Sequence, residues 1–149
     1  MENDAVALRL GRLVIASARL ELEVKHVAEF LGESDVGALS QLKQMKAIRR
    51  RARDRPDGDE IEAWAKEANE LLKERGTLVH GGFLGRWEGN AMVPAFIAHK
   101  RGEVVDIDLV RLDGLVESAG RLAAQGRDHS RRLFGEFTEE LGGNYHHEQ

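Results

Sequence analysis

The sequence predicts a mainly α protein, a four-helix bundle with a small β-hairpin inserted between the third and fourth helices. Apolar residues recur every three or four positions in four long segments, as in helices that bury one side. Glycines crowd one short region, and β-branched and aromatic residues follow it. The chain has 149 residues, of which 42% are hydrophobic and 32% charged, which suits one compact domain with its own core.

The first two helices are expected at 4–31 and 39–53. The apolar stripe of the first is Leu10, Leu13, Val14, Ser17, Leu20, Val24, Val27, Ala28 and Leu31. Gly32 follows this stripe, at a position where helices often end. The apolar edge of the second is Leu39, Leu42, Met45 and Ile48. Ser40 is its candidate N-cap, and Pro56 beyond its end cannot continue a helix without cost.

The third helix is expected to begin near Asp57 or Asp59, either of which can cap it, and to run to about Arg75. Its buried stripe is Ile61, Trp64, Ala68, Leu71 and Leu72. The fourth helix is expected from near Asp113 toward Phe137. Residues 1–141 then form a single helical domain, and 142–149, which open with two glycines, form a flexible tail.

The inserted hairpin is expected to consist of strands 91–99 and 103–109. Lys100-Arg101-Gly102 joins them and suits a tight turn. Pro94 lacks an amide hydrogen, which places the first strand at an edge of the hairpin.

The composition excludes several classes of protein. Cysteine is absent, which excludes a disulfide framework, a thiolate metal site and a cysteine nucleophile. The N-terminus is acidic, unlike a signal peptide, and the longest apolar stretch, 92–98, is too short to cross a bilayer. We therefore expect a cytoplasmic protein with no membrane contact.

The formal net charge of −4 hides two segments of opposite sign. Residues 43–55 hold seven basic residues and one acidic residue, whereas 57–70 hold six acidic residues and one basic residue. Arg49, Arg50 and Arg53 are candidate phosphate contacts to RNA. The alternative is a pair of helices whose charged faces neutralise each other.

One short stretch, 74–83, carries a catalytic candidate. Arg75 and His80 lie there with four residues between them. Histidine exchanges a proton near neutral pH, and arginine holds a phosphate and its developing charge. On an unbroken helix the two side chains would lie roughly 140° apart. A kink at Gly76, or a break after which Thr77 restarts the helix, would bring them together.

This stretch resembles the HEPN superfamily, whose members are helical bundles with an Arg, four to six residues, then His motif. Arg75 and His80 match that motif, Leu78-Val79 and Gly81 resemble common variants around it, and Gly76 stands where many members carry a polar residue. The resemblance implies a homodimer that cleaves RNA with Arg75 and His80, without a metal or other cofactor. Many members are toxins, which would make a cognate antitoxin protein a partner.

Two other functions are compatible with the residues. Members without activity serve as interaction modules, so a non-catalytic helical dimerisation module is the main alternative. A DNA-binding regulator that uses residues 43–55 is the other.

Overall fold

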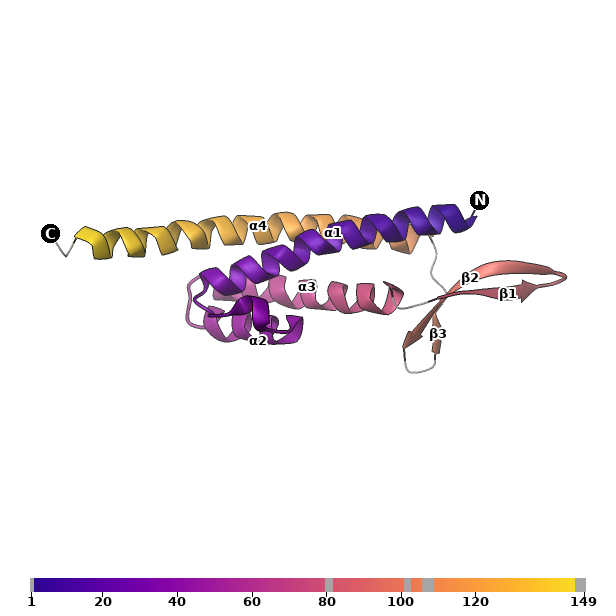
Figure 1. Cartoon of the computed structure of the whole chain (residues 1–149), viewed down its shortest axis with the longest axis horizontal. Coiled ribbons are helices and arrows are strands. Elements are labelled where there is room, and N and C mark those ends of the chain that lie inside the picture. The colour runs from indigo at the N-terminus through magenta and orange to yellow at the C-terminus, as the bar shows by residue number, and fades with distance from the viewer. Residues whose placement is uncertain (1, 80–81, 101–102, 106–108, 147–149) are drawn as a thin grey trace.

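The computed structural model describes residues 2–79, 82–100, 103–105 and 109–146, and it is built mainly from four helices (Figure 1). The elements are α1 (Glu2–Phe30), the 3₁₀ turn η1 (Val36–Ala38), α2 (Gln41–Ala52), α3 (Gly58–Val79), β1 (Gly82–Glu88), β2 (Ala91–Lys100), β3 (Glu103–Val105) and α4 (Leu109–His146). The predicted helical bundle is confirmed. None of the described helices is both long enough and apolar enough to cross a membrane.

Helices α1 and α4 run in parallel along most of the molecule (Figure 1). Arg9 donates to Asp113 at 2.9 Å near the start of both helices, and Ser130 donates to Glu23 at 2.8 Å further along. Helix α3 runs in the opposite direction beside them, and the short α2 packs on α3 (Figure 1). The core therefore lies between the parallel helices α1 and α4 and the antiparallel helix α3.

Every helix contributes large side chains to this core. The largest fully buried apolar ones are Leu13, Leu20, Val24, Val27, Ile48, Ile61, Leu112, Leu122 and Leu133. Two residues predicted on buried stripes are instead exposed, namely Val14 and Leu42.

Helices α1, α3 and α4 approach one another closely at Gly126. A Cβ atom added to Gly126 would lie 2.5 Å from Cζ2 of Trp64 and 2.9 Å from Cβ of Glu23. The Trp64 indole lies over this glycine and donates its Nε1 hydrogen to the Leu122 carbonyl at 2.8 Å. Only glycine fits there, so Gly126 permits the contact of the three helices.

The predicted two-stranded hairpin between the third and fourth helices is wrong. The insertion is a three-stranded antiparallel sheet in the order β1-β2-β3. The long partner of β2 is β1, paired from Gly82↔Ile97 to Glu88↔Ala91, whereas β3 pairs with only three residues of β2. Gly89, with φ +60°, makes the turn between β1 and β2, a conformation that favours glycine.

Two helices are longer than the sequence predicts. Helix α3 continues through Gly76 to Val79, so the predicted end at Arg75 is wrong. Helix α4 begins at Leu109 rather than near Asp113, and it continues through Gly142 to His146. As a result, the C-terminal part of α4 projects beyond the end of α1 (Figure 1).

Replacing Gly126 with alanine tests the close approach of the three helices. We expect Gly126→Ala to lower the free energy of unfolding by about 1–3 kcal/mol, because Trp64 or Glu23 must move to admit the methyl group. Gly120→Ala is the matched control in the same helix, with no atom within 4 Å of its new Cβ. It should raise stability by up to about 1 kcal/mol. Equal effects of the two changes in urea denaturation would contradict the close approach.

Candidate functional site

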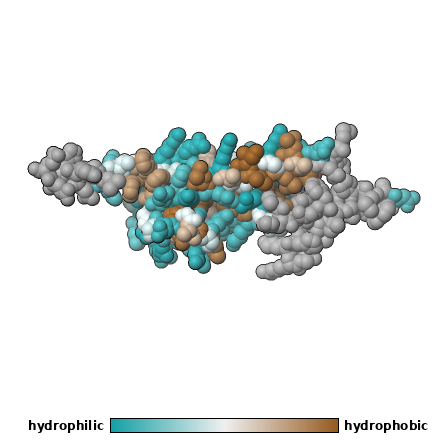
Figure 2. Space-filling view, in the orientation of Figure 1, coloured by the Kyte–Doolittle hydropathy of each residue, from teal (hydrophilic) through white to brown (hydrophobic). Residues whose placement is uncertain are grey.

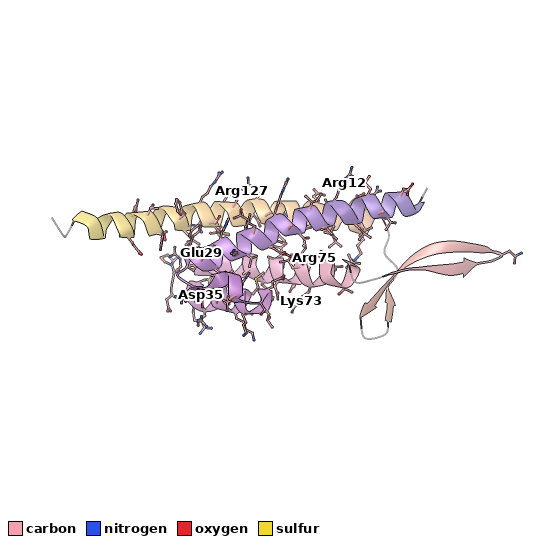
Figure 3. The ribbon with its side chains drawn as sticks, in the orientation of Figure 1. Arg12, Glu29, Asp35, Lys73, Arg75 and Arg127 are labelled. Carbon is pink, nitrogen blue, oxygen red and sulfur yellow. The ribbon has the colours of Figure 1, made fainter. Side chains whose placement is uncertain are left out.

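Arg75 lies in the last turns of α3, on the side that faces α1 (Figure 3). Its guanidinium donates to Oε1 of Glu21 in α1, and only 22% of its side chain is exposed. Its Nε atom is buried and has no hydrogen-bond partner among the residues that the structure describes. Arg75 thus joins two helices of its own chain, with one donor left unused.

The other half of the predicted catalytic pair, His80, lies outside the described residues. Helix α3 is continuous from Gly58 to Val79, so the helix does not break between Gly76 and Thr77.

The basic segment 43–55 is largely neutralised within the chain. Arg49 pairs with Glu62 at 3.3 Å, and Arg50 and Arg51 share Glu33 at 3.0 Å and 2.7 Å. The hydrogen bond from Arg51 holds the pKa of the Glu33 carboxyl below its ordinary value, against the effect of desolvation. The alternative of paired helix faces fits Arg49, whose partner Glu62 lies on α3, whereas the partner of Arg50, Glu33, lies between α1 and η1.

The third candidate of that segment, Arg53, differs from its neighbours. It is the C-cap residue of α2 and its side chain is exposed. An exposed arginine beside neutralised ones is a weak phosphate site, because affinity for nucleic acid rises with the number of phosphates contacted.

A second group of charges ties the start of α3 to α4. Arg55 donates to Asp57 at 2.9 Å and to Glu136 at 2.7 Å, and Arg132 pairs with Asp57 at 3.0 Å. The hydrogen bond from Arg55 lowers the pKa of Asp57. The opposite charges on the two sides of Pro56 therefore take part in ion pairs that hold helices together.

A groove of about 310 Å³ between α3 and α4 is lined by a buried histidine, His129, which no local sequence pattern singles out. His129 is 5% exposed, and its ring packs edge-on against Trp64 at a centroid distance of 5.6 Å. Arg132 lies 2.9 Å from Nδ1 of His129. Arginine can only donate, so Nδ1 accepts and the proton of the neutral ring lies on Nε2. Burial, assisted by Arg132, lowers the pKa of His129.

The most distinctive surface is the outer face of α1, which we define by seven residues that lie opposite its core stripe. These are Ala7, Leu8, Gly11, Val14, Ile15, Ala18 and Leu22, and all are exposed. Their spacing places them within about a third of the helix circumference. Ile15 is 61% exposed and Leu22 50% exposed. Hydrophobic surface gathers toward the end of the bundle where α1 begins (Figure 2).

At its C-terminal end the outer face meets a groove of about 400 Å³ between α1 and α2. The groove is lined by Ala18, Glu21, Leu22, Val24, Lys25, Gln41 and Gln44. Two of its residues, Ala18 and Leu22, also belong to the outer face. The face and the groove therefore form one continuous surface.

Metal chemistry has no visible support in the described part of the chain. Within it, no three histidine or carboxylate side chains are grouped closely enough to hold a metal ion. The groove around His129 is lined by Glu60, Asp128 and Arg132 and by the aromatic ring of Trp64, and Arg132 pairs with Asp57 at 3.0 Å.

Comparison with known proteins gives no further indication of function. The chain matches no protein-family model, no curated protein and no solved structure.

The buried neutral His129 predicts a loss of stability in mild acid. Its pKa in the folded chain lies below the ordinary 6.5, so the unfolded chain binds the proton more tightly and stability falls as the pH drops through 6.5. Thermal unfolding compared at about pH 7.5 and about pH 5.5 should show a lower midpoint in acid. The lowered pKa values of Glu33 and Asp57 act only below their ordinary 4.5 and 3.8, outside this range.

His129→Gln is the control, because its amide oxygen can still accept from Arg132 but does not titrate. The variant should show a flatter dependence on pH over this interval. An unchanged slope would mean that another group causes the acid sensitivity.

Proposed function

We propose that the chain is a non-catalytic helical interaction module whose contact surface is the outer face of α1. One observation carries this proposal. Helix α1 is apolar on two opposite sides, and the described part of the chain covers only one of them.

A helix with a single apolar stripe suits the surface of a domain, whereas a helix that is apolar on two opposite sides suits burial on both sides. Complete burial of a Leu or Ile side chain contributes about 1.5–3 kcal/mol, and Leu8, Ile15 and Leu22 are each at least half exposed. A contiguous patch of this kind marks a protein contact more often than a scattered exposed leucine does.

The arrangement of the basic side chains supports binding rather than catalysis. Arg75 is held by Glu21, and Arg49, Arg50 and Arg51 are held by carboxylates of the same chain. A phosphate ligand would have to displace these partners.

Photo-crosslinking in cells tests the proposal. A photoreactive amino acid at Ile15 or Leu22 should give discrete crosslinked species, because both side chains would lie inside an interface. Val110, which is 80% exposed at the start of α4, is the matched control for an exposed apolar residue off the face. Crosslinking at Ile15 and Leu22 no stronger than at Val110 would refute the contact surface.

A second candidate function is the metal-independent ribonuclease that the HEPN resemblance implies. The observation in its favour is Arg75, whose Nε is a buried donor that has no partner among the described residues. In that function a cytoplasmic homodimer would cleave RNA with Arg75 and His80, and an antitoxin protein would restrain it.

RNA cleavage in the presence of a metal chelator separates the two functions. The ribonuclease hypothesis expects cleavage by the purified chain that is lost in His80→Ala and Arg75→Ala but kept in Arg53→Ala. Absence of cleavage on varied RNAs, or the same rate in all variants, would leave the interaction module alone.

A further inference from the structure

We infer that the occupant of the outer face is a second copy of this chain, whose own α1 packs across it in the antiparallel direction. The inference rests on the interaction module proposed above and names its partner. It is drawn from the order of large and small residues along the face, and from what lies at its two ends.

Large and small side chains alternate along the outer face with a seven-residue repeat. The large ones, Leu8, Ile15 and Leu22, are seven residues apart, and the small ones, Gly11 and Ala18, are also seven apart. No atom lies within 4 Å of a Cβ built on Gly11, so that gap is open to an incoming side chain. A seven-residue repeat is the pattern by which two helices pack side chains into each other's gaps.

The direction follows from shape. In a parallel pair each large residue would meet its own copy, and the small residues would leave gaps opposite each other. In an antiparallel pair, large residues of one copy can pack over the small residues of the other. The same surface then serves both copies, as a two-fold contact requires.

The two ends of the face point to the same arrangement. Leu8 protrudes at the N-terminal end, with 54% of it exposed, and the groove beside Leu22 opens at the other end. Only an antiparallel copy brings the Leu8 of each chain to the groove of the other.

The charged residues at the two ends of the outer face also favour the antiparallel arrangement. Asp4 precedes the face and Lys25 follows it, and both are exposed. An antiparallel copy places Asp4 of one chain toward Lys25 of the other, whereas a parallel copy would place like charges together. Arg12 borders the face on the side of α1 away from α3 (Figure 3), where its long side chain can extend into solvent.

The mass of the purified chain, measured by light scattering during gel filtration, tests the partner. The full chain should have the mass of a dimer. Ile15→Glu should weaken the dimer roughly 100-fold or more, because it buries a charge near the two-fold axis in both copies. Val110→Glu should remain dimeric, and circular dichroism should show all three chains equally helical.

The absence of cysteine makes the direction directly measurable. Leu8→Cys and Leu22→Cys chains, mixed and treated with a short bifunctional maleimide, should link to each other and not to themselves. In a parallel pair these positions would lie about 21 Å apart along the axis, beyond such a reagent. Links within each variant alone would overturn the antiparallel arrangement.

The outcomes separate this inference from the proposed function. A monomeric chain, or a dimer unaffected by Ile15→Glu, would overturn the second copy as occupant. Crosslinks from Ile15 to other proteins in cells would still support an interaction module in that case. A monomeric chain that also gives no specific crosslinks at Ile15 or Leu22 would refute the interaction module itself.

Discussion

The close approach of three helices at Gly126 is the constraint on which the rest of the structure depends. With no side chain there, Trp64 of α3 lies directly on the α4 backbone, and Glu23 of α1 comes within van der Waals range of the same point. Glu23 is almost fully buried and accepts a hydrogen bond from Ser130, which fixes how α1 and α4 align. A buried carboxylate is tolerated because it is paired.

This contact also determines which faces remain free. Once α4 and α3 pack against the inner side of α1, the residues of the outer face stay exposed among the described residues. The short α2 packs chiefly on α3, and its first turn lines the groove beside Ala18 and Leu22. The apolar outer face of α1 is therefore a consequence of how the bundle is assembled, and its alternating large and small residues are not required by the core.

The helices were predictable because burial imposes a period that survives in the sequence. Leu13, Leu20 and Ile61 lie where their spacing predicts. The sheet was predicted less well, since no strand was expected in the glycine-rich region 82–89, which forms β1 and its turn. Gly76 likewise suggested a break, yet the core contacts of Leu71, Leu72 and Leu78 keep α3 helical on both sides of it.

The candidate site illustrates why charge is harder to predict than burial. Spacing along the chain can show that arginines cluster, but an ion pair joins residues that are distant in sequence. Glu33 lies 17 residues before Arg50, and Glu21 lies 54 residues before Arg75. No local pattern identifies these partners, so a neutralised cluster and an open phosphate site look alike in sequence.

Exposed apolar surface is a better indication of what this chain does than clustered arginines are. A carboxylate within reach can neutralise an arginine, so an arginine motif loses meaning once the chain supplies its own partner. An exposed apolar side chain has no such local remedy, because only contact with another apolar surface removes it from water. Arg75 is satisfied in part by Glu21, whereas Ile15 and Leu22 remain in water. The outer face of α1 is therefore the surface from which a partner is proposed.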